Sequence, residues 1–217
     1  MKKKSEGRPG KDLKNPFTRG SILSVSQLRN YRIIKRIGRG SFGAVYRAEK
    51  DGAVMALKLV NLREASTEKF ILECEMAKLF SELKAGPVYS ESWSVPKENV
   101  GVIVTELWDT SLGKFMDNCE LKSVPKMVVE KIQTQLDRIH RIGASHFDLH
   151  AENILLRLSD KGQICDATLT DFGHAMLTEA LDCTTLHEIL DNFGLSKRTQ
   201  AADIDRLQFN QIKREWK

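Results

Sequence analysis

Four short segments of this chain hold residue types that suit chemistry on phosphate groups. The first is the glycine-rich segment Gly38–Val45, which reads GRGSFGAV. Glycines at this spacing let backbone N–H groups approach phosphate oxygens, an approach that a Cβ atom would block. Alone the pattern is weak, because a glycine-rich hairpin also has it. It differs from the dinucleotide-binding fingerprint, since a strand pattern and not a helix follows it.

The second segment is Val54–Lys58, where a lysine ends a run of apolar strand residues. Lys58 there needs an anionic partner or loses hydration energy, unless it lies at a sheet edge and reaches solvent. The next helical pattern offers two acids, Glu73 and Glu75. Glu73 shares a helix side with Met76, so we expect it to point inward and to pair with Lys58, and Glu75 to face solvent.

The third and fourth segments read HFDLHAENIL, from His146, and LTDFG, from Leu169. They contain Asp148, Asn153 and Asp171, acids and an amide at a spacing that suits phosphoryl transfer. One Asp would accept the proton of the nucleophile, while the Asn and the other Asp would hold Mg²⁺ across the phosphates. Taken singly, each of these residues could equally be a turn or cap residue.

The elements that must position these segments follow from hydrophobic periodicity and turn residues. A helix is predicted over Ser66–Leu83, and another over Val124–Ile142, which ends at Gly143. Short strands are predicted at residues 31–37, 44–49, 54–60, 89–95, 100–105, 154–158 and 167–170, and a last helix from about 201 to 216. The order is five strands with one helix, followed mostly by helices. This indicates an α+β chain in two lobes.

Together and in this order, the four segments resemble the protein kinase family, whose signature is a Gly-rich loop, a strand lysine, HRDLxxxN and DFG. The resemblance covers roughly residues 31–173 and extends more weakly to 207. It implies a bilobal protein-kinase-like fold with a five-stranded N-lobe sheet, a helix C and a truncated, mostly helical C-lobe. The expected domains are a flexible basic tail over 1–28, an N-lobe over 29–107 and a truncated C-lobe over 108–217.

The resemblance also implies a role for each matching residue. Asp148 would be the catalytic base, Lys58 would pair with the ATP phosphates and Glu73, and Asn153 and Asp171 would bind Mg²⁺. Thr105 would be the gatekeeper beside adenine. The residues implied to bind ATP are Ile37, Gly38, Gly40, Ser41, Phe42, Gly43, Val45, Ala56, Lys58, Glu106 through its carbonyl and Trp108 through its N–H.

Two residues of the catalytic segment depart from the family. Phe147 replaces the arginine of HRD, which usually binds a phosphate on the activation loop, so we do not expect activation by loop phosphorylation. His150 replaces the lysine that contacts the γ-phosphate, which should weaken stabilisation of the transition state. Antibiotic and choline kinases also have a histidine at that position.

The third departure is length, because 44 residues follow Gly173 and none of them forms an APE motif. Asp203 resembles the aspartate that opens helix F, and its alternative reading is a helix N-terminal capping acid. The chain is therefore expected to end near helix F, as in some bacterial effector and large-DNA-virus kinases. An activating partner protein would complete the short lobe.

Composition excludes several other classes. The chain has 217 residues with 34 basic and 29 acidic side chains, a net charge of +5. The first twenty residues alone carry a net +5, so the remainder is balanced and has no basic stripe for specific nucleic-acid binding. No apolar run could cross a membrane and no signal peptide is visible. Four scattered cysteines predict reduced thiols, and the basic tail leaves nuclear entry open beside a cytoplasmic location.

The sequence therefore predicts an ATP- and Mg²⁺-dependent protein kinase acting on a protein substrate. Glu152, four residues after Asp148, favours Ser/Thr specificity, since it matches the DLKPEN form of the loop. Two alternatives stay open: a pseudokinase-like binding module and a small-molecule kinase. A zinc site on His146 and His150, which are four residues apart, is disfavoured because Phe147 stands where HExxH has its glutamate.

Overall fold

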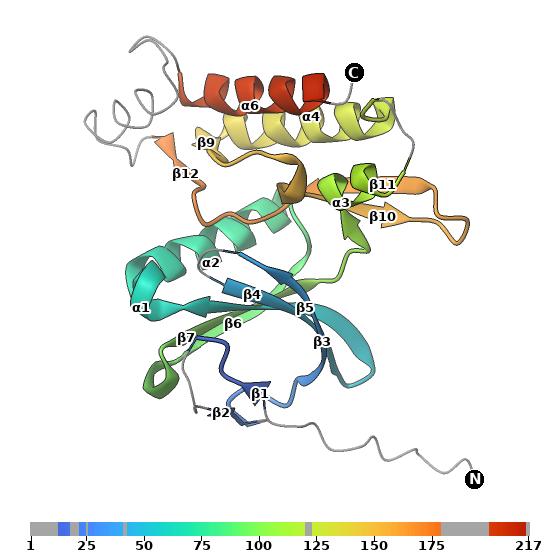
Figure 1. Cartoon of the computed structure of the whole chain (residues 1–217). Coiled ribbons are helices and arrows are strands. Elements are labelled where there is room, and N and C mark those ends of the chain that lie inside the picture. Colours follow the sequence, from blue (N-terminus) through green and yellow to red (C-terminus); the bar gives the residue numbers. More distant parts are fainter. Residues whose placement is uncertain are drawn as a thin grey trace. The chain divides into compact units, whose positions relative to one another are not determined.

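The chain divides into two compact units in a computed structural model. One unit comprises residues 1–70 and 90–107, and the other residues 71–89 and 108–217. Figure 1 shows the order of the elements. The residues that the structure describes are 13–17, 22–24, 26–40, 43–119, 123–178 and 200–215. These units are groups of residues that pack together and each combines two separate stretches of the chain, whereas the predicted domains are continuous ranges. The predicted domain boundaries therefore stay predictions.

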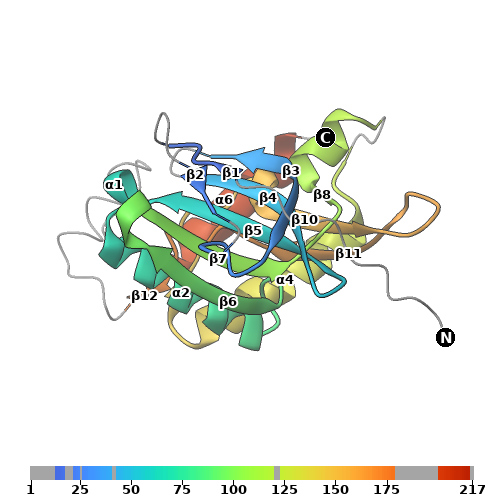
Figure 2. The same cartoon turned by 90° about the horizontal axis from the view of Figure 1, so that it is seen from below.

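The first unit is built on a five-stranded sheet, as predicted (Figure 2). A two-residue turn joins its second and third strands, and both Asp51 (φ +52°) and Gly52 (φ +83°) are left-handed there. Such turns match the twist of paired strands, which is why an Asp-Gly pair favours a two-residue hairpin. In sheet order the strands are β3 (Arg32–Arg39), β4 (Gly43–Lys50), β5 (Ala53–Asn61), β7 (Val100–Glu106) and β6 (Tyr89–Val95).

The segment that precedes this sheet is part of the fold. Strands β1 (Leu13–Lys14) and β2 (Ile22–Leu23) pair in antiparallel fashion. Leu23 and Leu28 are completely buried in the same apolar core as Leu57 of β5. The prediction of a flexible arm over 1–28 is therefore wrong for the described residues of that range. The many charged, Gly and Pro residues of this range favoured a disordered segment. A few apolar side chains within it nevertheless pack in the core of the sheet.

One carboxylate fixes residues 26–31 to this unit. Glu91 accepts hydrogen bonds from Arg29 (2.5 Å) and the Tyr31 hydroxyl (2.9 Å), and Lys50 lies 3.4 Å away. Burial raises the pKa of Glu91, but the hydrogen bonds from Arg29 and Tyr31 and the Lys50 charge outweigh it, so the pKa lies below its usual 4.5. The charged form is thus favoured by folding.

We expect Glu91→Gln to lower the free energy of unfolding by about 1 kcal/mol at pH 6. Because the folded pKa of Glu91 is depressed, its contribution is complete above the ordinary value and is lost as pH falls through the folded pKa. The difference between wild type and variant should therefore shrink from pH 5 toward pH 3. Urea unfolding at several pH values measures it, and a difference independent of pH would contradict the prediction.

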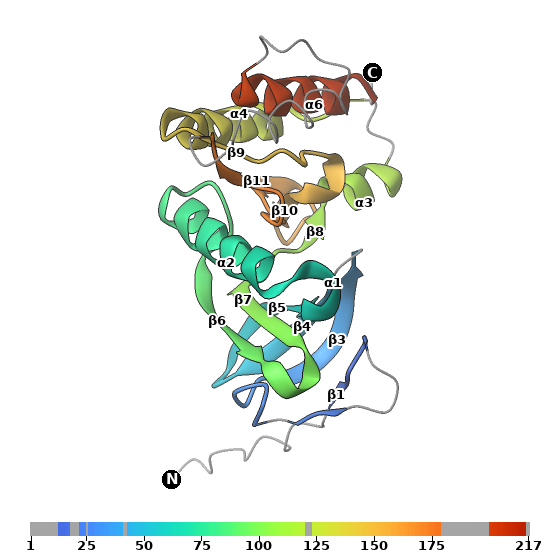
Figure 3. The same ribbon diagram turned by 90° about the vertical axis from the view of Figure 1, so that its left-hand side faces the viewer.

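The second unit is mostly helical. Helix α4 (Lys126–Arg141) buries Val128, Ile132, Leu136 and Ile139 at the helical period. Phe209 of α6 (Ala201–Glu215) and Phe80 of α2 (Thr67–Glu82) belong to the same core. Figures 1 and 3 show α6 lying alongside α4. The helices are α2 (Thr67–Glu82), whose residues from Ile71 onward belong here, α3 (Leu112–Asp117), α4 (Lys126–Arg141) and α6 (Ala201–Glu215).

Short strands carry the catalytic segments of this unit. Strands β8 (Thr110–Ser111), β10 (Ile154–Leu158) and β11 (Ile164–Leu169) form one small sheet, and β9 (Ala144–Ser145) pairs with β12 (Met176–Leu177). A 3₁₀ turn, η2 (Ala151–Asn153), precedes β10, whereas the short helices α1 (Leu62–Ala65) and η1 (Pro96–Glu98) belong to the first unit. The predicted helices and long strands are confirmed with ends shifted by at most three residues. The two-residue strands and α3 were not predicted.

Two expectations about the whole chain can be compared with the described residues. Among them, no helix has the length and apolar character needed to cross a bilayer. Cys74, Cys119 and Cys165 are reduced cysteines, and Cys183 lies outside the described residues.

Candidate active site

The first unit presents the predicted lysine on one face of its sheet. Lys58 of β5 lies opposite Val45 of β4 and Ile103 of β7, and Ala56 lies opposite Thr105. Directly opposed residues of antiparallel strands share a face, and so do residues two apart on one strand. Lys58, Val45, Ala56 and Thr105, to which the resemblance assigns contacts with ATP, therefore lie on one face of the sheet.

Backbone hydrogen bonds join the two ends of the glycine-rich segment. The Gly40 N–H donates to the Gly43 carbonyl at 2.9 Å, and Gly38 pairs with Val45. A Cβ at Gly43 would lie 2.7 Å from the Leu59 carbonyl oxygen, so only glycine fits at the start of β4. Ile37 lies in β3 and Glu106 ends β7. Ser41 and Phe42 are outside the described residues.

In the second unit, Asp148 and Asn153 are in direct contact. The Asn153 side-chain Nδ2 donates to the Asp148 carbonyl (2.8 Å) and to its carboxylate Oδ2 (3.2 Å). The His150 Nε2 lies 3.7 Å from the same Oδ2. The carboxylate of Asp148 is about two-fifths exposed, which leaves it accessible to a reacting group. The structure thus places the predicted base in a defined orientation, with a partly exposed carboxylate on a loop whose neighbouring residues are buried.

The backbone of this loop is anchored by a buried acid that the sequence analysis missed. Asp205 of α6 is completely buried and accepts hydrogen bonds from the N–H groups of His146 (2.9 Å) and Phe147 (2.8 Å) and from His140 Nε2 (2.8 Å). Phe147 has a left-handed backbone, with φ +63°. Such a conformation costs a bulky residue roughly 1–2 kcal/mol, so the Asp205 bonds are what keep the loop in it.

Asp203, the residue matched to the helix F aspartate, does not bind the loop. Its carboxylate accepts from the Gln200 N–H (3.3 Å) and from Arg206 (2.9 Å) and is 41% exposed. Asp203 is the third residue of α6 and accepts from the N–H of Gln200, the residue before the helix, so it is a capping acid of the first turn, although it does not occupy the N-cap position itself. The helical period could have identified Asp205, because it shares a face with the buried Ala201 and Phe209.

Asp171 and Glu73 approach one another around Gly173. A Cβ built on Gly173 would lie 3.6 Å from both the Asp171 Oδ1 and the Glu73 Oε2. Glu73 is 8% exposed and Glu75 is exposed, as predicted from the helical period. The neighbouring Phe172 packs edge-on against Phe80 of α2, with centroids 4.8 Å apart. This aromatic contact ties the helix that carries Glu73 to the segment that carries Asp171.

The two catalytic segments are joined by hydrogen bonds. The His146 Nε2 bonds the Thr170 carbonyl (2.9 Å), and the Thr170 N–H donates to the Asn153 carbonyl (3.0 Å). The Asp148 N–H points to the other His146 nitrogen, Nδ1, at 3.4 Å. Both ring nitrogens of His146 are therefore engaged. This disfavours the zinc alternative, and the described residues hold no cluster of three metal-ligating side chains.

The predicted residues are thus gathered in two groups, one in each unit. Lys58 belongs to the first unit and Glu73 to the second, so their pairing stays a prediction. Trp108, in the second unit, lies under the Arg157 guanidinium, 4.6 Å from the ring centroid. The donor chemistry fits the implied cation, because carboxylate and amide oxygens such as those of Asp171 and Asn153 are the ligands that Mg²⁺ prefers.

Comparison with known proteins gives the same result as the motifs. The model of the protein kinase domain matches residues 31–192. The serine/threonine-protein kinase ULK3 of Rattus norvegicus is 26% identical over 164 residues, which cover 72% of this chain and 34% of the relative. The serine/threonine-protein kinase PknD of Mycobacterium tuberculosis is 29% identical over 163 residues, 69% of this chain and 23% of the relative.

The serine/threonine-protein kinase greatwall of Mus musculus is 26% identical over 204 residues, which cover 90% of this chain and 22% of the relative. The chain thus spans about a third or less of the length of these relatives. The crystal structure of the PF14_0431 kinase domain matches with a TM-score of 0.59 at 18% identity, over 70% of this chain and 53% of that one. This likeness confirms the predicted fold class. Because the family model matches well over half of its residues, the chain belongs to the protein kinase family.

Proposed function

We propose that this chain is an ATP- and Mg²⁺-dependent protein kinase that transfers the γ-phosphate to a serine or threonine hydroxyl of a protein substrate. The observation that carries the proposal is the arrangement around Asp148. Its carboxylate is exposed, Asn153 orients it, and Asp205 binds the backbone on its N-terminal side. A general base needs this combination of access and fixed geometry.

In the proposed reaction, the substrate hydroxyl oxygen forms a bond to the γ-phosphorus. The bond between that phosphorus and the bridging oxygen of ADP breaks, and ADP carries away the electron pair. Asp148 accepts the hydroxyl proton through its carboxylate and releases it to solvent after transfer. The Asn153 Nδ2, 3.2 Å from Oδ2, holds the carboxylate so that a free lone pair faces the incoming hydroxyl.

The remaining groups bind and orient the nucleotide. Asp171 and the Asn153 amide oxygen would hold Mg²⁺, which supplies positive charge to the phosphate oxygens when it is bound. Lys58 would bind the phosphates from the sheet face that it shares with Val45 and Ala56. The His150 Nε2 lies 3.7 Å from the Asp148 Oδ2, at the position where other members of the family have a lysine. A histidine would contribute less to phosphate binding than that lysine, because it is only partly charged near neutral pH.

Serine/threonine specificity is supported by two observations. The matched relatives are named as serine/threonine-protein kinases. In addition, Glu152 precedes Asn153 as in the DLKPEN form of the loop, and the Ser111 hydroxyl donates to its carboxylate at 2.5 Å. Glu152 is thereby fixed beside the catalytic loop, where a substrate peptide would pass.

Phosphate transfer from [γ-³²P]ATP to dephosphorylated casein, in the presence of Mg²⁺, tests the proposal with the full 217-residue chain. We expect label on phosphoserine and phosphothreonine after acid hydrolysis. Asp171→Asn should lower the rate about 100-fold or more, because the amide keeps an oxygen ligand but removes the negative charge with which the carboxylate attracts Mg²⁺. The matched control is Asp160→Asn in the exposed 159–162 turn, which should retain the wild-type rate.

Two results would overturn the proposal. Equal incorporation by wild type and Asp171→Asn would show that the label does not come from this site. Label found on small hydroxyl metabolites in a cell extract, with none on protein, would instead identify a small-molecule kinase.

A further inference from the structure

A glutamine of α6 binds the catalytic loop on both sides of the proposed base. The Gln208 Nε2 donates to the Phe147 carbonyl (3.1 Å), and its Oε1 accepts from the Leu149 N–H (3.0 Å). We propose that Gln208 is a positioning residue that fixes the backbone of Asp148 for catalysis. The proposal rests on the proposed function, since it concerns the base of that reaction.

The two bonded groups belong to the two peptide units that meet at the Asp148 Cα atom. The Phe147 carbonyl is part of the unit before that atom, and the Leu149 N–H is part of the unit after it. Their planes define φ and ψ of Asp148. A single planar amide that binds both planes therefore restrains both angles, and with them the direction in which the Asp148 side chain leaves the backbone.

Gln208 acts beside Asp205, three residues earlier on the same helix face. Asp205 binds the N–H groups of His146 and Phe147, whereas Gln208 binds the Phe147 carbonyl and the Leu149 N–H. A carboxylate has acceptors alone, so Asp205 could not bind a carbonyl group. The amide supplies the donor that the Phe147–Asp148 peptide needs.

The strained backbone of Phe147 explains why this peptide needs a donor. Phe147 has φ +63°, and relaxation to the ordinary negative region would rotate the peptide unit between Phe147 and Asp148. That rotation would move the Phe147 carbonyl away from the Gln208 Nε2. The hydrogen bond thus opposes the relaxation that would displace the base.

We expect Gln208→Met, which is similar in length but forms neither bond, to lower kcat about 10- to 100-fold. The KM for ATP should stay within about twofold, because the two hydrogen bonds that the variant loses are both to the backbone of the catalytic loop. Gln208→Glu keeps the acceptor for Leu149 but lacks the donor for Phe147, so it should also lower kcat. The matched control is Gln211→Met, one turn later and exposed, where Gln211 bonds only Glu215 among the described residues.

Rates are divided by the folded fraction measured by circular dichroism. A residue that only stabilises the fold would leave the corrected kcat unchanged, and that result would overturn the proposal.

Amide hydrogen exchange, followed by NMR, tests the contact without any need for kinase activity. In Gln208→Met the Leu149 N–H should exchange at least about tenfold faster, while the Phe147 N–H, bound by Asp205, keeps its protection. Unchanged exchange at Leu149 would overturn the proposal. If the wild-type chain transfers no phosphate, the proposed function fails, and the exchange of Leu149 still decides whether Gln208 restrains Asp148.

Discussion

Asp148→Asn should lower the rate of phosphate transfer by about 10²- to 10⁴-fold, the usual contribution of a positioned general base. The amide is nearly isosteric with the carboxylate but cannot accept the hydroxyl proton. Asn153 Nδ2 would still bind the backbone carbonyl of residue 148, so the loop should keep its conformation. Initial rates with [γ-³²P]ATP measure the effect on phosphate transfer, and the Kd of a fluorescent ATP analogue measures the effect on nucleotide binding.

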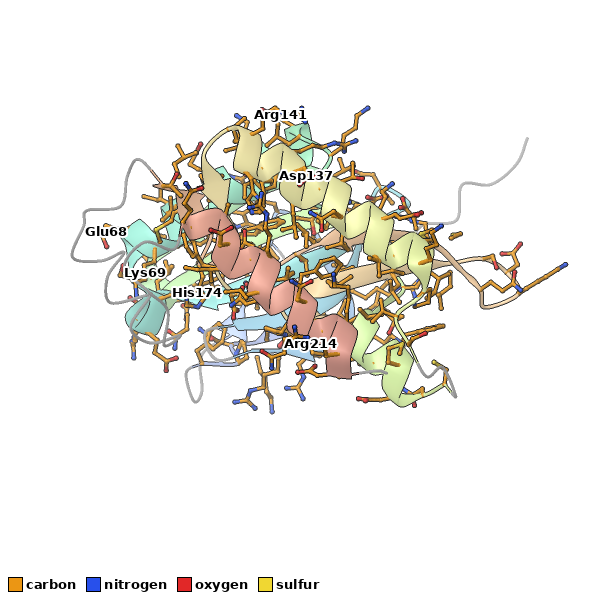
Figure 4. All side chains as sticks on the ribbon, turned by 90° about the horizontal axis from the view of Figure 1, so that it is seen from above. Glu68, Lys69, Asp137, Arg141, His174 and Arg214 are labelled. Carbon is orange, nitrogen blue, oxygen red and sulfur yellow. The ribbon has the colours of Figure 1, made fainter. Side chains whose placement is uncertain are left out.

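The Kd for nucleotide should change by less than about threefold, because the predicted phosphate ligands lie on other residues. The matched control is Asp137→Asn, which should keep the wild-type rate. Asp137 is an exposed residue of α4 and is labelled in Figure 4. If Asp148→Asn retained half of the wild-type rate, Asp148 would not be the base.

Asp205→Ala should lower the free energy of unfolding by about 3 to 5 kcal/mol. The carboxylate is completely buried, and its removal leaves the N–H groups of His146 and Phe147 without their acceptor. Each buried donor left unpaired costs about 1 to 3 kcal/mol. His140 also loses the partner of its Nε2. Urea unfolding followed by circular dichroism measures the change at neutral pH.

The comparison with Asp203→Ala distinguishes this effect from the loss of any acid in α6. Asp203 is two residues away and partly exposed, and its loss should cost about 1 kcal/mol at most, as for other capping residues. An equal or larger cost for Asp203→Ala would show that the roles of the two acids are reversed.

The contrast between these two acids also shows how far sequence reasoning reached. The inward orientation of Glu73 and the outward orientation of Glu75 follow from the period of one helix, and the structure agrees. The choice between Asp203 and Asp205 instead depends on a loop 58 or 59 residues earlier in the chain. The resemblance to the kinase motif pointed to Asp203 and not to Asp205. A motif gives the order of residue types along the chain, but it does not tell which side of α6 packs against the loop.

The N-terminal residues illustrate a second reason. Leu23 and Leu28 lie in the short stretch SILSVSQL that follows a polar, basic segment, and this stretch is too short for its apolar residues to define a period. They are buried only because the sheet of the first unit offers an apolar surface, which is a property of strands that begin later. Gln208 was missed for a related reason, since a half-buried glutamine has no local signature until its partners are known.

The dependence of the catalytic loop on α6 has a consequence for the time course of synthesis. The acceptors for the N–H groups of His146, Phe147 and Leu149 are encoded 58 or 59 residues later. At about 5–20 residues per second, the ribosome needs roughly 3 to 12 seconds to supply them. During that interval the hydrogen bonds by which α6 holds the left-handed Phe147 are absent. A nascent chain therefore acquires its catalytic loop only after α6 has emerged, when the rest of the small sheet is already available.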